Sequence, residues 1–193
     1  MENEFIQIKS ARVNFPHLFK KPVINGEEGK CGAQLMLDPE TNAGAIKEIK
    51  TAITEILKER NKGKKIPGSK LCLQKGEERG RDEYEGLMVL SANAKGFPVV
   101  ISGDGKTKIE SEEDSNIYGG CYCNAKVRLW FQDNKYGKRV NCELVAIQFA
   151  KDGEPLDGSY VSEETAMEGF DATEEPRSEA SGAEEDAVDD MFD

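Results

Sequence analysis

The chain has 193 residues, of which 37% are hydrophobic and 33% are charged. This length favours one globular domain with a tail over several domains. We expect neither a secretory signal nor a membrane span, because the opening Met-Glu-Asn-Glu-Phe lacks basic and apolar regions and no stretch approaches roughly 18 apolar residues. Five cysteines then indicate reduced thiols in a cytoplasm, and the single histidine, His17, excludes most histidine-based catalysis.

Charge is distributed unevenly along the chain. Residues 1–153 hold 25 basic and 22 acidic residues, which gives +3, whereas residues 154–193 hold one basic and 15 acidic residues, which gives −14. The pI near 4.8 therefore describes the tail more than the folded part. Such asymmetry indicates a nucleic-acid partner or an acidic regulatory segment.

The elements follow from periodicity and turn residues. Alternating β-formers predict strands over 5–13, 30–37, 87–94, 99–102, 118–132 and 138–150, with one more short strand near 71–73. Apolar residues at helical spacing predict one helix over 43–60, which Thr41 or Asn42 caps and which Asn61 and Gly63 end. Residues 61–84 and 103–116 are polar and predict loops.

This order of elements predicts a mainly β fold. Five or six of these strands, with one inserted helix and long loops, favour a five-stranded antiparallel barrel of the OB type over a doubly wound α/β sheet. We place this domain at residues 1–153. Residues 154–193 are rich in Glu, Asp, Ser, Ala and Gly and lack the apolar residues for a core, so we expect a disordered acidic tail.

Residues 121–131 alternate strictly between two kinds of side chain. The odd positions are all apolar and predict the core face, whereas the even positions carry Tyr122, Asn124, Lys126, Arg128 and Trp130. On a strand these outward side chains are spaced by about 6.6 Å. Aromatic rings stack on bases and cations hold phosphates, so this row favours single-stranded nucleic acid. An unspecified partner surface and a plain solvated face stay open as alternatives.

Further basic and aromatic residues are candidates to extend this surface. They lie just before the row, after the first strand and at the last hairpin: Tyr118; Phe15, Phe19, Lys20 and Lys21; Lys135, Tyr136, Lys138 and Arg139. We expect the tail to regulate DNA binding, because a tethered charge of −14 competes with DNA phosphate for the basic groove. Its tip, Asp189-Asp190-Met191-Phe192, could insert its apolar pair into a partner protein.

Three alternative sites, for zinc, for Mg²⁺ and for phosphate, are weaker. Cys121 and Cys123, with Cys31, Cys72 and Cys142, could supply zinc thiolates, but residues two apart on a strand do not match zinc spacing, so we expect core cysteines. The carboxylates between Asp104 and Asp114 could bind Mg²⁺ in a nuclease, but they lie in a polar loop. Gly103-Asp104-Gly105-Lys106-Thr107 lacks the full spacing of a phosphate loop. We expect no enzyme, cofactor or metal.

The last two strands carry a family resemblance. Gly120-Cys-Tyr-Cys-Asn-Ala-Lys-Val-Arg-Leu-Trp130, Gln132-Asp-Asn134, Tyr136-Gly-Lys-Arg-Val-Asn-Cys-Glu-Leu144 and Gln148-Phe-Ala-Lys-Asp-Gly153 resemble a phage and prophage family of single-stranded DNA-binding proteins. The resemblance runs from about Phe5 to Gly153. That family is similar to tailed-phage replication proteins with acidic C-terminal tails. Such tails usually end on phenylalanine, whereas here Asp193 follows Phe192.

The resemblance implies an OB barrel, sequence-independent binding of single-stranded DNA, and a role in phage DNA replication, recombination or repair. An annealing or recombination mediator and, less favoured, a metal-dependent nuclease are the alternatives. The expected partners are single-stranded DNA, RNA more weakly, and replication or recombination proteins through the tail. A homodimer is left open, no membrane partner is expected, and the predicted location is the cytoplasm of an infected or lysogenic bacterium.

Overall fold

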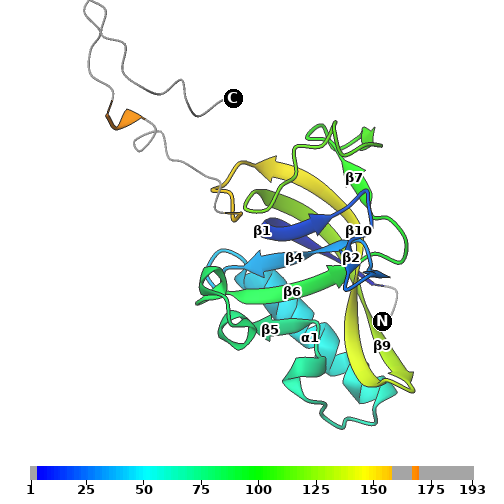
Figure 1. The fold of residues 1–193 in the computed structure, drawn as a ribbon. Coiled ribbons are helices and arrows are strands. Elements are labelled where there is room, and N and C mark those ends of the chain that lie inside the picture. Colours follow the sequence, from blue (N-terminus) through cyan, green and yellow to red (C-terminus); the bar gives the residue numbers. More distant parts are fainter. Residues whose placement is uncertain (1–3, 158–166, 170–193) are drawn as a thin grey trace, which may run out of the picture. The chain divides into compact units, whose positions relative to one another are not determined.

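The computed structural model describes residues 4–157 and 167–169, and its main features are a curved sheet and one long helix (Figure 1). The strands are β1 Phe5–His17, β2 Val23–Ile24, β3 Glu27–Glu28, β4 Gly32–Leu37, β5 Leu73–Lys75, β6 Met88–Asn93, β7 Val99–Ile101, β8 Lys108–Ile109, β9 Tyr122–Asn134 and β10 Gly137–Lys151. The helices are α1 Ala43–Arg60 and three short 3₁₀ turns, η1 Gly68–Lys70, η2 Gly76–Arg79 and η3 Asp82–Tyr84.

Five of these strands close into a barrel. Neighbouring strands pair in the order β6-β4-β1-β9-β10, and an additional pairing of β6 with β10 completes the ring. Four of the five pairings are antiparallel, and the closing β6–β10 pairing is parallel, which differs from the fully antiparallel barrel that we predicted. A five-stranded barrel of this kind with one inserted helix is consistent with the OB fold, as the sequence indicated.

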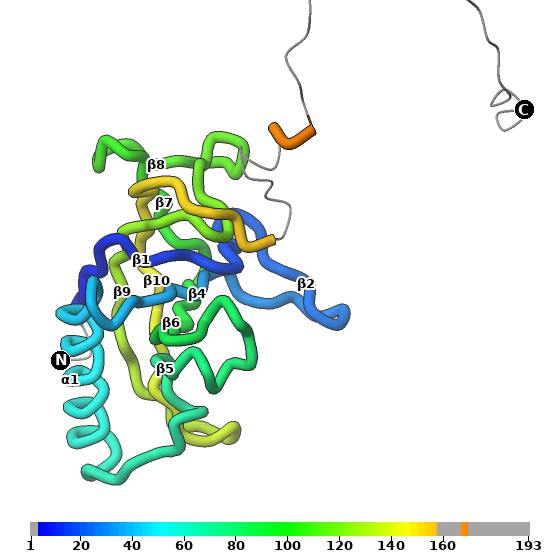
Figure 2. Tube along the Cα trace, turned by 90° about the vertical axis from the view of Figure 1, so that its left-hand side faces the viewer, coloured from blue at the N-terminus to red at the C-terminus, as the bar shows by residue number. Residues whose placement is uncertain are grey.

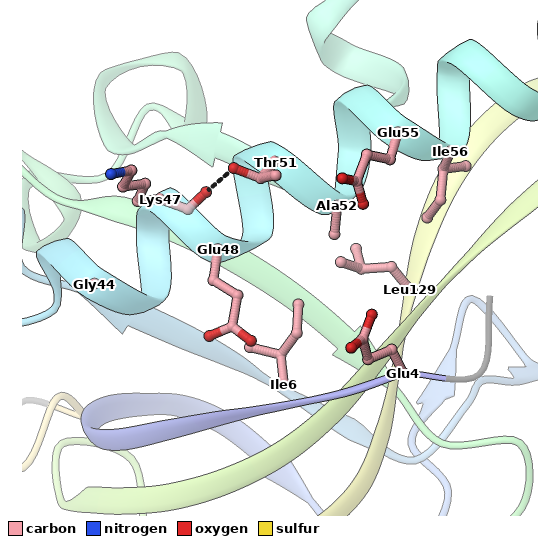
Figure 3. Close-up of a pocket in the computed structure, with 10 residues that line it drawn as sticks. All are labelled: Glu4, Ile6, Gly44, Lys47, Glu48, Thr51, Ala52, Glu55, Ile56 and Leu129. Atoms are coloured by element: carbon pink, nitrogen blue, oxygen red, sulfur yellow. Dashed lines mark hydrogen bonds between the residues drawn. The ribbon is translucent and has the colours of Figure 1, made fainter. Parts of the chain in front are cut away.

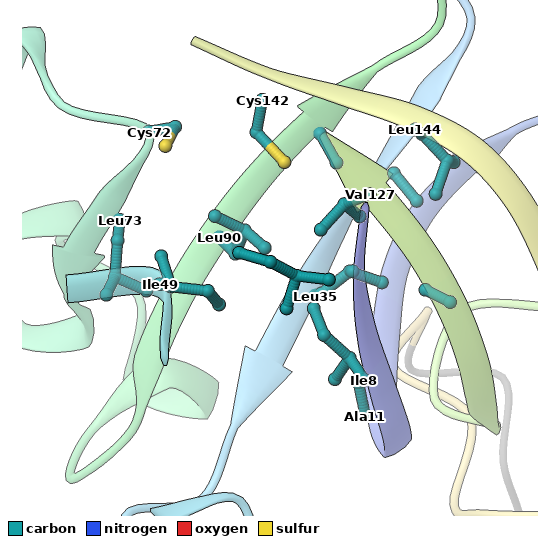
Figure 4. Packing of buried hydrophobic residues seen from close by; sticks show 14 of the residues in the cluster. Ile8, Ala11, Leu35, Ile49, Cys72, Leu73, Leu90, Val127, Cys142 and Leu144 are labelled. Atoms are coloured by element: carbon teal, nitrogen blue, oxygen red, sulfur yellow. The ribbon is translucent and has the colours of Figure 1, made fainter. Parts of the chain in front are cut away.

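Alternating residues of the barrel strands fill its interior. Ile8, Leu35, Leu90, Val127 and Leu144 are each no more than 1% exposed and belong to one core cluster (Figure 4). The helix α1 adds Ile46, Ile49, Ile53 and Ile56 to this cluster, and Figure 2 shows it along one side of the barrel, away from the β2–β3 hairpin. The four isoleucines lie on one face of α1, so the helix covers the core on this side.

The helix occupies the predicted residues, but its N-terminus works differently. The Asn42 side chain does not cap α1; its Nδ2 donates to the Lys9 carbonyl at 2.8 Å and its Oδ1 accepts from Asp38 N at 3.0 Å. Asn42 thus ties the helix to β1. At the other end Asn61 and Gly63 stop the helix as predicted, since both backbone amides donate to the Leu57 carbonyl.

Three short strands were missed from the sequence. The β2–β3 hairpin, closed by the Asn25-Gly26 turn, and β8 each have two residues per strand, too few for an alternation to show. The predicted strand over 118–132 begins instead at Tyr122. The reason is a turn at Gly119-Gly120, where Gly120 has a φ of +114°.

This turn also holds the segment that follows the barrel. A Cβ on Gly120 would lie 2.1 Å from the Glu154 carbonyl oxygen. The Arg12 guanidinium donates to the carbonyls of Gly120 and Glu154 at 3.2 and 2.7 Å, and Leu156 N donates to Gly119 O at 3.0 Å. Residues 154–156 are therefore anchored beside the start of β9.

Replacing Gly120 by alanine should lower the free energy of unfolding by about 2–3 kcal/mol, because a Cβ meets both an unfavourable φ and a backbone carbonyl. Chemical denaturation of both proteins measures this. Gly44→Ala is the matched control: Gly44 lies in α1 with nothing within 4 Å of an added Cβ, so this variant should keep or slightly raise stability. Equal stability of the two variants contradicts this account of the turn.

The five cysteines lie in the core, as predicted. All are buried, and Cys72 and Cys142 are drawn among the core residues in Figure 4. Burial raises the pKa of the Cys72 thiol to about 12 and that of Cys142 well above its ordinary value. Buried, protonated thiols are poor metal ligands. In the described ranges, the helices are too short or too polar to cross a bilayer.

Candidate nucleic-acid interface

The strand β9 has two faces that differ in kind. Its odd residues from Cys123 to Phe131 are buried, whereas Tyr122, Asn124, Lys126 and Arg128 are half-buried and Trp130 is 38% exposed. The predicted alternation is therefore confirmed residue by residue. The even side chains form what we call the outer row of the barrel.

One end of the outer row opens into a groove of about 960 Å³. Its floor is the outer face of β9 and β10, including Arg128, Trp130 and Glu143. The connection between β1 and β4, residues 18–31, carries the β2–β3 hairpin, and we call it the β2–β3 arm. The walls of the groove come from this arm, from the turn after β6 and from the end of α1: Lys21, Glu28, Gly29 and Lys30; Asn93, Ala94, Lys95 and Gly96; Arg60. Four segments far apart in sequence thus line one groove together with Trp130.

The groove is positively charged. Five cations and two carboxylates line it among the described residues, namely Lys21, Lys30, Arg60, Lys95 and Arg128 against Glu28 and Glu143. Lys21 Nζ lies 2.8 Å from Glu28 Oε2, and the Arg128 guanidinium binds Glu143 through Nε at 2.9 Å and through Nη2. The groove therefore combines an aromatic ring with an excess of three positive charges.

An additional aromatic residue lies beside the groove. Phe5 on β1 pairs with Arg128 on β9 and is 49% exposed. The Lys126 ammonium and the Arg128 guanidinium lie 5.7 and 5.8 Å from its ring centroid. These cation–π contacts place two cations of the outer row over one exposed ring. Phe5 is exposed because it alternates along β1 with the buried Ile6 and Ile8. This alternation was visible in the sequence and could have indicated Phe5.

The other end of the outer row is occupied by the protein itself. Lys151 Nζ lies 4.6 Å from the Tyr122 ring centroid, and Gly153 packs against the same ring. Asn124 accepts from Ser10 N at 3.1 Å and donates to Gln148 Oε1 at 3.1 Å, which bridges β1 and β10 where β1 has a register shift. Tyr122 and Asn124 therefore have structural partners and do not line the groove.

Tyr118 lies outside strand β9. Its hydroxyl is 2.9 Å from both Asp152 Oδ1 and the Gly153 carbonyl, and it accepts from Gly153 N at 3.1 Å. Desolvation raises the pKa of Tyr118 above its ordinary value. Its geometry is that of an anchor for the segment after β10.

Four candidates were predicted to follow the first strand, but β1 extends to His17, so Phe15 lies within it. Only Lys21 of the four lines the groove. Phe19 is partly buried against the core, and Lys20 is exposed. Phe15 is 40% exposed and lies under the Arg81 guanidinium, 4.7 Å from its ring centroid. The structure thus separates these residues although they are neighbours in sequence.

The hairpin between β9 and β10 carries the last cluster. Lys135 lies 4.9 Å from the ring centroid of Tyr136, which is 70% exposed at the tip. Lys138 Nζ donates to Asn61 Oδ1 at 2.8 Å and so ties the hairpin to the end of α1. Arg139 is half-buried and pairs with Gln132, a groove residue. None of these four residues lines the groove, and only Arg139 pairs with a residue that does.

Other recesses fit nucleic acid less well. One of about 380 Å³ between α1, β1 and β9 has an apolar floor that includes Ile6 and Leu129 (Figure 3). Its rim carries Glu4, Glu48 and Glu55, which repel phosphate. A third recess along α1 has three lysines, Lys47, Lys50 and Lys58, but no aromatic ring for a base.

The acidic loop is organised by its own hydrogen bonds. Asp104 accepts from Ser102 Oγ at 2.5 Å, from the backbone amides of Lys106 and Thr107, and from Thr107 Oγ1. These bonds hold the pKa of Asp104 well below its ordinary value, and the bond from Ser102 has the largest effect. Within the described residues there is no group of three or more candidate metal ligands.

A barrel with a basic groove around one exposed tryptophan is the architecture of an oligonucleotide-binding protein. Residues 4–180 match the family described as Enterobacter phage Enc34, ssDNA-binding protein, and the chain belongs to that family. The match to the phage family that the resemblance indicated is therefore confirmed.

Individual relatives and solved structures are similar to most of this chain. Protein p50 of Acyrthosiphon pisum secondary endosymbiont phage 1 is 31% identical over 175 residues, which cover 86% of this chain and 92% of that protein. The single-stranded DNA-binding protein from bacteriophage Enc34, solved in complex with ssDNA, is 32% identical with a TM-score of 0.71, covering 79% of this chain and 89% of that one. A second structure of the Enc34 protein is 30% identical, with a TM-score of 0.71, and covers 84% and 89%.

Several groove residues escaped the sequence analysis. Lys30 and Arg60 were predicted only as the start of a strand and the end of a helix, and Lys95 lies between two predicted strands. A single lysine in a loop gives no indication in the local sequence that it will line a groove together with residues from other segments. The tip residues Asp189, Asp190, Met191 and Phe192 lie outside the described residues, as does nearly all of the predicted tail.

Proposed function

We propose that this phage protein binds single-stranded DNA without sequence preference and that the strand crosses the outer row through the groove at Arg128 and Trp130. One observation carries the proposal: five cations converge around one exposed tryptophan in a single groove. A base stacks on Trp130 while phosphates lie against the cations, an arrangement that tolerates any base. The relatives solved as single-stranded DNA-binding proteins support the same assignment.

The path that we propose for the DNA differs from the one that the sequence of β9 alone suggested. The outer row runs along β9, but Tyr122 and Asn124 at one end are engaged by Lys151, Ser10 and Gln148. In OB folds the connections after the first barrel strand and before the last flank the ligand. Here these are the β2–β3 arm and the β9–β10 hairpin, and the arm walls the groove. We therefore propose that the single-stranded DNA crosses the sheet and does not run along β9.

The acidic tail regulates this groove in our proposal. Residues 158–193 carry 13 acidic residues and one basic residue. A tethered polyanion raises the local concentration of carboxylates and competes with DNA phosphates. DNA that displaces the tail frees its tip, including Met191 and Phe192, for replication or recombination proteins. The protein then acts in phage DNA replication, recombination or repair in the host cytoplasm, and binds RNA more weakly.

Charge reversal tests the groove. Lys30→Glu and Lys95→Glu should each weaken binding of a labelled dT oligonucleotide several-fold and make the salt slope shallower by about 0.7, the value of one phosphate contact on a single strand. Fluorescence anisotropy at several salt concentrations measures both quantities.

Lys106→Glu is the matched control, because it makes the same charge change at an exposed turn residue outside the groove. This variant should bind nearly as tightly as the unaltered protein. If Lys106→Glu weakens binding as much as the groove variants, net charge governs binding and the groove does not.

A further inference from the structure

Both carboxylates of the groove, among the described residues, are already bound to cations of the same groove. Glu28 pairs with Lys21, and Glu143 pairs with Arg128. A phosphate that approaches either cation meets an oxyanion that is already in place. Carboxylate and phosphate use the same guanidinium and ammonium donors, so the two groups compete for them.

The two pairs differ in how strongly they compete. The Lys21 and Glu28 side chains are 38% and 67% exposed, whereas those of Arg128 and Glu143 are 30% and 17% exposed. Water and salt screen the first pair, and exposed pairs of this kind contribute little. The second pair is better shielded and uses two N–H donors of one guanidinium. Glu143 is therefore the stronger competitor.

Glu143 is placed by the register of the sheet. It lies opposite Arg128, and the next outward residue of β10, Asn141, lies opposite Trp130. Arg128 is held on its other side by the Phe5 ring. The carboxylate thus lies beside Arg128 and diagonal to Trp130 on the neighbouring strand. A phosphate that follows a base stacked on Trp130 and binds Arg128 therefore comes close to this carboxylate.

We infer that Glu143 is an internal competitor of the DNA phosphate, which holds Arg128 in the free protein and lowers the affinity of the groove for single-stranded DNA. The inference rests on the proposed function. On binding, Arg128 exchanges one oxyanion for another, and the released carboxylate remains in the groove and repels the strand. Glu143 therefore limits affinity and shortens the lifetime of the complex.

The test is Glu143→Gln, which keeps the size of the side chain and removes its charge. Affinity for a labelled dT oligonucleotide should rise about five- to tenfold at low salt, and the salt slope should steepen by up to about 0.7, because Arg128 becomes a full phosphate partner. Stopped-flow dissociation should slow in the same proportion, since changes at a shielded, hydrogen-bonded charge pair act mainly on dissociation. Glu28→Gln should give a smaller gain.

Glu110→Gln is the matched control, because Glu110 pairs with Lys108 at 3.1 Å on the exposed β7–β8 edge, outside the groove. It makes the same charge change and should alter affinity by less than about twofold. In an Arg128→Gln background, the gain from Glu143→Gln should shrink to that of the control. Thermal melts check folding, and Glu143→Thr repeats the test with a strand-forming residue.

The outcomes separate this inference from the proposed function. A Glu143→Gln affinity equal to that of Glu110→Gln overturns the inference while DNA binding stands. A weakened Glu143→Gln also overturns it, because Glu143 then orients Arg128 for DNA. Failure of the unaltered protein to bind the oligonucleotide at low salt rejects the proposed function itself, and the inference with it.

Discussion

Replacing Trp130 by alanine should weaken binding of single-stranded DNA about 5- to 150-fold, because stacking of one base on an aromatic side chain contributes roughly 1–3 kcal/mol. Trp130 lies in the groove among its cations and is 38% exposed, so its truncation removes a stacking surface and little of the core. Anisotropy titrations with a labelled dT oligonucleotide measure the loss, and thermal melts should show a folded variant.

Two aromatic variants make this prediction specific. Trp130→Phe keeps a ring in place and should retain most of the affinity. Tyr136→Ala removes a ring that is 70% exposed at the β9–β10 tip but does not line the groove, so it should bind almost normally. Equal losses in Trp130→Ala and Tyr136→Ala would show that the strand follows the hairpin and does not cross the groove.

Deleting residues 158–193 should tighten DNA binding about tenfold or more at low salt, because the deletion removes a tethered competitor of net charge −12. The gain should shrink as salt screens the tail. The deletion should start after Asp157, because the Glu154 carbonyl accepts from Arg12 and Leu156 N donates to Gly119. A cut at residue 154 would remove these contacts and confuse stability with affinity.

A neutralised tail distinguishes charge from length. In this variant, Gln replaces Glu and Asn replaces Asp at the last six acidic residues, which are Glu184, Glu185, Asp186, Asp189, Asp190 and Asp193. This variant should recover part of the gain although its chain length is unchanged. If the deleted and neutralised proteins both bind DNA as the full chain does at low salt, the tail does not compete for the groove.

The sequence predicted the local features of this protein well. The alternation of residues 121–131 sets the two faces of β9, and the isoleucine spacing sets α1, because both patterns repeat over many residues. The barrel followed from the count of strands and the single helix. The strand start was wrong by four residues, since the positive φ of Gly120 ends the extended backbone before Tyr122.

The groove could be predicted only in part. Arg128, Trp130 and Lys21 were among the expected residues, but Lys30, Arg60 and Lys95 join them through strand register and loop placement across the barrel. Such convergence is a long-range property that no local pattern records. For the same reason the sequence did not indicate that Arg128 faces Glu143 or that Tyr122 is covered by Lys151 and Gly153.

Titration of the intact chain with poly(dT), followed by tryptophan fluorescence at several salt concentrations, tests the central claim most directly, because Trp130 is the only tryptophan. We predict saturable quenching, and the logarithm of the affinity should fall linearly with the logarithm of the salt concentration, with a slope of about 0.7 per phosphate contact. Binding that leaves the emission of Trp130 unchanged, or that does not weaken with salt, would contradict it.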